Sequence, residues 1–398
     1  MHTWKTTLII CWVAQFFSIM GFSFAIPFAP FYLQDLGVTD PSNLRLWSGL
    51  FASAAGLSMA LVTPFWGYLA DRVGKKPMTL RASLGGTITL MGMGLAQSPE
   101  TLLVFRIIQG LFTGTVTAYL TLVVSETPKE RMGFAVGMMN SAVFMGNSVS
   151  PLLGGLFADL FGFRASFFVA SGLLLVSFLL SMFFVREDFT PKASVKFSFF
   201  ADLRKILLHA GVFPIVGMIF LYGMSRTLDR PVLPLLVQEM VSTQSDGHLG
   251  LATQAGLVTS AAGFAVVLAG LMIGTLADRG RSLKIGVICA FCAIGLSLCM
   301  VFVSRVWQLT ALYFGSAFFI GGIDPILKVI LARIVPAEQR GSAFGLIGSA
   351  RSLGWFAGAF SGGILAVLLG LRSVFVIIAG LFAIIAALLA LLGRGKDY

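Results

Sequence analysis

The stretch that decides the fold is a charged turn at residues 67–76, which reads Gly-Tyr-Leu-Ala-Asp-Arg-Val-Gly-Lys-Lys. It separates two long apolar runs, 47–70 and 78–97. A degenerate copy, Gly-Thr-Leu-Ala-Asp-Arg-Gly-Arg at 274–281, separates two further apolar runs. A helix needs about 20 apolar residues to cross the ~30 Å hydrocarbon core of a bilayer. The two copies therefore indicate a repeated set of membrane-spanning helices.

The composition agrees with a membrane protein. Of the 398 residues, 57% are hydrophobic and 11% are charged, whereas a soluble domain carries about 25% charged residues. The apolar runs that predict spans lie at 7–34, 47–70, 78–97, 101–125, 134–158, 165–185, 210–240, 252–277, 285–303, 307–332, 342–369 and 373–392. We therefore expect an all-α integral membrane protein with twelve transmembrane helices.

The two halves of the chain are related by an internal repeat. An offset of 208 takes Pro128 to Pro336 and Arg164 to Arg372, and an offset of 204 relates the first spans of the halves. Parallel repeats of this kind place a substrate site between the halves near the membrane midplane. The predicted domains are an N-terminal six-helix bundle (1–185), a cytoplasmic linker (186–209) and a pseudo-symmetric C-terminal six-helix bundle (210–398).

Lysine and arginine are concentrated in alternate connections between the predicted spans. The other connections carry only Arg45, Arg164, Arg305 and Arg372. Because cytoplasmic loops keep the excess of Lys and Arg, we expect both termini in the cytoplasm. The net charge of +11 thus reflects topology and does not indicate nucleic-acid binding. Compact loops and short termini favour a multi-pass protein of the bacterial inner membrane, and no small-residue cleavage site follows the first apolar run.

The turn at 67–76 resembles the signature loop of the major facilitator superfamily, G-x-L-A-D-R-x-G-R-K, with a lysine in place of the last arginine. The resemblance implies a transporter fold in which this loop gates the cytoplasmic side. In the family, the aspartate at the position of Asp71 caps the eleventh span, and the cation at the position of Lys75 pairs with an acid that ends the fourth span. The resemblance assigns the gating role to Gly67, Asp71, Arg72, Gly74, Lys75 and Glu126. The alternative is a basic turn that only fixes topology.

Two further motifs resemble those of particular family members. In span four, Arg106-Ile-Ile-Gln-Gly is similar to a motif of proton-coupled members, which implies that Arg106 takes part in proton transfer. The alternative is that Arg106 holds span four against span one. In span five, Gly146, Ser150, Pro151, Gly154 and Gly155 match the antiporter motif G-x-x-x-G-P-x-x-G-G, with a serine at one glycine. This resemblance favours export.

Charged residues inside the predicted spans are the candidate site. A single charge at the centre of a membrane costs roughly 2.5–3.5 kcal/mol on insertion scales, so such side chains pair or face water. The candidates are Arg106, Arg226, Asp229, Arg230, Asp324, Lys328 and Arg351. Asp229 and Asp324 are candidates for the proton that couples transport, and Pro325 predicts a kink beside Asp324. Structural ion pairs, such as Asp324 with Lys328 at i, i+4, are the alternative.

The substrate class stays open at this point. Span one lacks an acid at its middle, which argues against recognition of lipophilic cations by a span-one carboxylate, and the excess of intramembrane cations suits an anionic or zwitterionic amphiphile. Met20, Phe24 and Met145 are candidates for an adaptable apolar pocket. Our leading hypothesis is a monomeric, proton-coupled exporter of hydrophobic or amphipathic compounds. The runner-up exports or flips an anionic amphiphile such as a lysolipid, a lipid-linked sugar or a siderophore.

Other classes of function fit less well. An integral-membrane enzyme would need a catalytic constellation, and the three histidines lie near the termini or in connections without a metal-binding pattern. We expect no enzyme activity, metal or cofactor. A receptor or scaffold that does not transport would not need repeated charges inside its spans.

Overall fold

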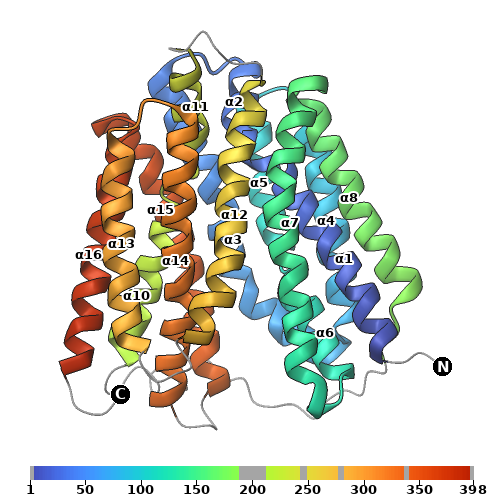
Figure 1. Ribbon diagram of the computed structural model, residues 1–398. Coiled ribbons are helices and arrows are strands. Elements are labelled where there is room, and N and C mark those ends of the chain that lie inside the picture. Colours follow the sequence, from blue (N-terminus) through green and yellow to red (C-terminus); the bar gives the residue numbers. More distant parts are fainter. Residues whose placement is uncertain (1–3, 188–211, 243–248, 277–281, 336–339, 395–398) are drawn as a thin grey trace. The chain divides into compact units, whose positions relative to one another are not determined.

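The computed structural model describes residues 4–187, 212–242, 249–276, 282–335 and 340–394 (Figure 1). Within these ranges the chain forms helices joined by short turns, and no strand occurs. Most of the predicted linker, 188–209, lies outside the described residues. The helices are α1 (Trp4–Phe24), η1 (Ile26–Phe28), α2 (Ala29–Asp35), α3 (Pro41–Val73), α4 (Lys76–Gly94), α5 (Pro99–Phe112), α6 (Thr115–Glu126), η2 (Lys129–Arg131), α7 (Met132–Phe161), α8 (Phe163–Phe184), α10 (Val212–Ser225), α11 (Leu233–Ser242), α12 (Leu251–Leu276), α13 (Ser282–Val301), α14 (Val306–Ile334), α15 (Arg340–Leu369) and α16 (Ser373–Arg394).

Ten stretches of the described chain are long and apolar enough to cross a membrane. They match ten of the twelve predicted spans. The third predicted span corresponds to α4, which carries Lys76 and Arg81 and is less apolar. The seventh corresponds to two shorter apolar helices, α10 and α11. The all-α membrane fold is thus confirmed, while the full number of twelve spans stays a prediction.

The chain forms two compact units. The first contains Met1–Thr39, Leu57–Lys196 and His248–Ser260, and the second contains Asp40–Gly56, Phe197–Gly247 and Ala261–Tyr398. The start of α3 thus groups with the second unit and the start of α12 with the first, and the predicted domain bounds stay a prediction.

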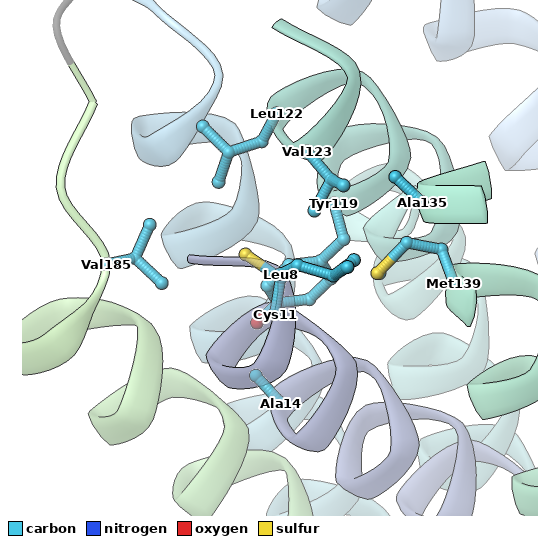
Figure 2. Packing of buried hydrophobic residues seen from close by; sticks show 9 residues of the cluster. All are labelled: Leu8, Cys11, Ala14, Tyr119, Leu122, Val123, Ala135, Met139 and Val185. Carbon is cyan, nitrogen blue, oxygen red and sulfur yellow. The ribbon is translucent and has the colours of Figure 1, made fainter. Parts of the chain in front are cut away.

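In the first unit, α1 packs along α7 and α8, and α4 packs along α8 (Figure 1). Figure 2 shows buried side chains where α1, α6 and α7 meet. Cys11 and Ala14 of α1 are small, which lets Tyr119 and Leu122 of α6 and Met139 of α7 approach closely. Helices inside a membrane gain little from excluding water, so close packing of this kind stabilises them.

A stripe of small residues repeats in both units. On α7, a Cβ built at Gly146 would lie 3.3 Å from the Phe16 carbonyl oxygen, and one at Gly154 would lie 2.0 Å from the Phe24 carbonyl oxygen, both on α1. Small residues spaced by four face a neighbouring backbone, which is the small-xxx-small mode of membrane helix packing. Only a residue without a side chain fits at position 154, and a Cβ at position 146 would require Ile19 to shift.

The same stripe occurs in the second unit, where α15 packs along α10. A Cβ at Gly354 would lie 2.3 Å from the Phe220 carbonyl oxygen, and one at Gly362 would lie 2.0 Å from the Leu228 carbonyl oxygen. Gly354 and Gly362 are the repeat partners of Gly146 and Gly154 at the offset of 208. The internal repeat therefore extends from the sequence to the way in which the helices pack.

Candidate functional site

The seventh predicted span is interrupted between α10 and α11, where residues 226–232 form turns. The break keeps its backbone hydrogen bonds local, since the Asp229 carbonyl accepts from the N–H of Leu233 at 2.7 Å. Non-helical backbone at membrane depth is tolerated where protein or a wet cavity satisfies it. The break contains three of the predicted site residues, Arg226, Asp229 and Arg230.

Asp229 is buried, with 5% of its surface exposed. Its carboxylate accepts a hydrogen bond from the Tyr313 hydroxyl of α14 at 2.7 Å. Arg226 lines the same small cavity as Asp229 and Tyr313, and Arg230 is exposed. Among the residues that the structure describes, no cationic side chain reaches within 4.0 Å of the Asp229 carboxylate. Asp229 is thus a buried acid without an ion-pair partner in that part of the chain.

The other intramembrane acid, Asp324, has two cationic partners. Its Oδ2 lies 2.8 Å from Lys328 Nζ on the same helix, and its Oδ1 lies 2.7 Å from Arg351 Nη2 on α15. The Asp324 side chain is 19% exposed, that of Lys328 is 40% exposed and that of Arg351 is 21% exposed. α14 continues through Pro325 as one helix. The expected Asp324–Lys328 contact is therefore part of a cluster of three charges that joins α14 to α15.

Span four is interrupted at Thr113 and Gly114, between α5 and α6. Gly114 has φ +122°, a conformation that favours glycine. Arg81 donates to the Thr113 carbonyl at 3.2 Å, and its guanidinium lies 3.6 Å from the ring centroid of Trp66. Arg81 therefore satisfies a backbone oxygen that the break frees, a role that we did not predict.

Arg106 lies on α5, six residues before the end of the helix at Phe112. Its Nη1 donates to the side-chain oxygen of Gln109, which is almost completely buried. The contact keeps the guanidinium along its own helix and joins the two polar residues of the span-four motif. Participation of Arg106 in proton transfer and its support of span one both stay predictions.

The antiporter-like motif of α7 packs on two neighbours. One face meets α1, where the Ser150 hydroxyl donates to the Met20 carbonyl at 2.7 Å. The serine at this position therefore replaces a glycine contact with a hydrogen bond. The other face meets the start of α12, where a Cβ at Gly155 would lie 2.3 Å from the Ala252 carbonyl oxygen, and one at Gly256 would lie 2.3 Å from the Pro151 carbonyl oxygen.

Pro151 also affects the hydrogen bonds of this contact. A proline inside a helix lacks an N–H and distorts the preceding turn. The next N–H, that of Leu152, donates to the hydroxyl of Ser260 on α12 at 2.9 Å. The start of α12 belongs to the first compact unit because these small residues and this hydrogen bond hold it against α7.

The end of α7 caps the start of α12. The Asp159 carboxylate accepts from the backbone N–H of Ala252 at 3.0 Å and of Thr253 at 2.7 Å, and from the Thr253 hydroxyl at 2.6 Å. The first N–H groups of a helix have no partner within it, and a negative charge there is favourable. Gly250 is required at this place, because a Cβ would lie 2.1 Å from Asp159 Oδ2.

The second unit contains a related contact of opposite charge. Arg45, on α3, donates to the Ala366 carbonyl near the end of α15 at 3.1 Å. A Cβ at Gly49 would lie 2.8 Å from Cα of Gly363, the repeat partner of Gly155. A cation near a helix C-terminus is favourable for the same reason as an anion near an N-terminus. This contact groups the start of α3 with the second unit.

The predicted gating loop connects α3 to α4. Gly74 has φ +98°, which explains a glycine at the turn. The carboxylate of Glu187 accepts from the backbone N–H of Lys75 at 2.8 Å and of Lys76 at 2.7 Å, so it caps α4. The guanidinium of Arg72 lies 4.4 Å from the ring centroid of Tyr68.

Several expectations for this loop remain untested. The side chain of Asp71 lies outside the described part, and so does the connection that precedes α15. No atom of the described residues lies within 4 Å of a Cβ built at Gly67, so the close contact expected there is not seen among them. The pairing of Lys75 with Glu126, which ends α6, stays a prediction.

The three residues predicted to form an apolar pocket differ in environment. Met20 and Phe24 are buried on α1, and the Phe24 ring lies 5.9 Å from that of Phe157 on α7. Met145 is exposed on α7. Met20 and Phe24 therefore take part in the packing of α1 on α7, and their contact with a substrate stays a prediction.

Sequence reasoning missed four polar residues with clear partners. These residues are Arg81, Asp159, Glu187 and Tyr313. Tyr313 was open to detection, because tyrosine is rare here, with 6 tyrosines against 37 phenylalanines. A buried tyrosine usually finds a hydrogen-bond partner, so a tyrosine within a predicted span indicates a polar neighbour.

Comparison with known proteins gives a consistent family. The family model described as Major Facilitator Superfamily matches residues 11–240 and 215–397. The multidrug resistance protein MdtG of Salmonella arizonae is 33% identical over 380 residues, which cover 94% of this chain and 92% of the relative. MdtG of Citrobacter koseri is 33% identical over 377 residues, with the same coverage.

Solved structures share the fold. The nucleoside transporter NupG superposes with a TM-score of 0.82 at 13% identity, covering 98% of this chain and 100% of that one. A bacterial homolog of the human lysosomal transporter Spinster gives 0.78 at 13% identity, covering 97% of this chain and 96% of that one. The predicted fold and the family resemblance are thereby confirmed. The chain is a multi-pass membrane transporter that belongs to the Major Facilitator Superfamily.

Proposed function

We propose that the protein is a proton-coupled exporter of hydrophobic or amphipathic compounds that works by alternating access. The observation that carries the proposal is the 33% identity, over 94% of the chain, to relatives named multidrug resistance proteins. The antiporter-like motif of α7, with its close contacts on α1 and α12, supports the direction. We place the monomer in a bacterial inner membrane, with both termini in the cytoplasm.

The intramembrane charges support coupling to protons. Protonation removes the charge of a buried acid, and a ligand that binds one conformation better than another shifts the balance between them. A proton bound at an intramembrane acid therefore favours one orientation of the transporter. Substrate binding favours the other, so the two species exchange across the membrane.

Dye efflux from proteoliposomes tests the proposal. Purified protein is reconstituted in vesicles loaded with the lipophilic cationic dye Hoechst 33342, with and without an imposed pH gradient. We expect efflux that speeds up when protons flow into the vesicle. The matched control is Asp40→Asn, which changes an exposed acid whose carboxylate accepts from the N–H of Asn43. Equal efflux with and without a gradient, for this dye and for lipophilic anions, would contradict proton coupling.

An exporter of an anionic amphiphile is the second candidate. Arg226 and Arg230 favour it because both lie in the break of span seven, beside a single acid. Lys328 and Arg351 favour it less than the sequence alone indicates, because Asp324 neutralises part of their charge. Transport of a fluorescent lysophosphatidylglycerol in preference to Hoechst 33342 would support this candidate, and the reverse preference would count against it.

A further inference from the structure

A small polar cavity lies within the second unit, beside the break in span seven. Its polar lining comes from Ser225, Arg226, Asp229, Ser297, Tyr313 and Ser316, and the remainder is apolar. Its volume of about 20 Å³ is sufficient for one water molecule when polar partners are present. The cavity therefore joins the buried acid of α10–α11 to polar groups of α13 and α14.

One cavity residue, Ser297, has a buried hydroxyl that is free to form a further hydrogen bond. Ser297 is 1% exposed, and its hydroxyl has no hydrogen-bond partner among the described residues. A buried polar group of this kind usually binds protein or water. Ser297 and the Asp229 carboxylate line the same space, so a water there has partners on both sides.

The two intramembrane acids differ in what protonation would disrupt. A proton on Asp324 would weaken contacts of 2.8 and 2.7 Å to two cations. A proton on Asp229 would break no ion pair in the described part of the chain. Its Oδ2 already accepts from Tyr313, which leaves Oδ1 as the oxygen on which a proton adds.

We propose that Asp229 is the carboxylate that binds the coupled proton, and that Tyr313 positions it. A water held between Ser297 and Asp229 would accept a proton that enters from solvent and donate one to Oδ1, so that it remains a neutral water. Asp324 instead holds α14 to α15 through its contacts with Lys328 and Arg351. The coupling of this proton to transport rests on the proposed function. Which acid is protonated can be tested without transport.

The charged groups around Asp229 are few. Arg226 and Arg230 lie in the same break, and Tyr313 comes from α14. The cavity residues of α13 and α16 carry no charge. On α14 and α15, Asp324 contacts both Lys328 and Arg351, so this cluster of one acid and two cations keeps a net positive charge. Arg226, Arg230 and Tyr313 are therefore the neighbouring groups whose charge or hydrogen bonding affects protonation of Asp229.

Infrared difference spectroscopy tests the assignment on the full-length protein in liposomes without substrate. Acidification should produce the C=O band of a newly protonated carboxyl group. We expect Asp229→Asn to remove one such band, and Asp324→Asn to retain it. Tyr313→Phe should keep the band but change its frequency, since the carboxyl loses its hydrogen bond. Circular dichroism and thermal stability control for folding.

Each outcome decides the assignment. The proposal would be overturned if Asp229→Asn kept all the carboxyl C=O bands of the wild type. It would also be overturned if a C=O band disappeared only in Asp324→Asn. An unchanged frequency in Tyr313→Phe would overturn the role of Tyr313, and this variant keeps the test valid if Asp229→Asn fails to fold. Failure of all dye transport with the predicted spectra intact would contradict the proposed function and leave the protonated acid assigned.

Discussion

The glycine stripes predict that one added methyl group has the same effect in both units. Gly154→Ala would place its Cβ 2.0 Å from the Phe24 carbonyl oxygen, and Gly362→Ala would place it 2.0 Å from the Leu228 carbonyl oxygen. Real Cβ atoms essentially never approach below 3.0 Å, so the helices must separate. Overpacking of this kind costs about 1–3 kcal/mol.

The cost is partly offset by helix propensity. Alanine is favoured over glycine inside a helix by roughly 0.5–1 kcal/mol, which leaves a net loss of up to about 2.5 kcal/mol at each site. The matched control is Gly172→Ala on α8, where no atom of the described residues lies within 4 Å of the added Cβ. This control keeps the gain in helix propensity without the clash.

Thermal unfolding in detergent measures the effect. Gly154→Ala and Gly362→Ala should both lower the Tm by similar amounts, and Gly172→Ala should leave it unchanged or raise it. If both stripe variants are as stable as the control, the close helix contacts at Gly154 and Gly362 are contradicted. If only one of them loses stability, the helix contacts inside one unit are not equivalent to those inside the other.

Three further variants test the polar contacts. Asp159→Ala should lower thermal stability by roughly 1 kcal/mol, the usual cost of losing an N-cap, and Asp159→Asn should cost less because it keeps an acceptor oxygen; equal Tm values for wild type and Asp159→Ala would contradict the cap. Asp324→Asn should cost more than the ~1 kcal/mol of an exposed ion pair and less than the ~3–5 kcal/mol of a buried one, and Lys328→Gln should cost less because Arg351 remains; the reverse order of Tm would refute the cluster. Asp71→Asn should fold normally but transport slowly, and dye flux at the wild-type rate would remove its gating role.

Much of the fold follows from the sequence because membrane constraints are simple. Apolar length predicts spans, and the offset of 208 by itself pairs Gly154 with Gly362. The structure gives those pairs equivalent neighbours, because equivalent helices repeat the same backbone contact. The motif at 146–155 likewise predicted close packing, although not the second face that meets α12.

The site was less predictable because its contacts join residues that are far apart in the sequence. Asp229 and Tyr313 are separated by 84 positions, and no spacing rule relates them. Asp324 and Lys328 were predicted as i, i+4 neighbours, but Arg351 comes from another helix. The break at 226–232 contains Pro231, yet the kink was expected at Pro325, where α14 continues as one helix.

Proton counter-movement during dye transport tests proton-coupled export most directly. Proteoliposomes with equal pH on both sides contain a trapped pH indicator and receive an outward gradient of Hoechst 33342. We predict that dye leaving the vesicle drives protons inward, that Asp229→Asn abolishes this acidification, and that Asp40→Asn retains it. Dye efflux without any proton movement in the wild-type protein would contradict the account.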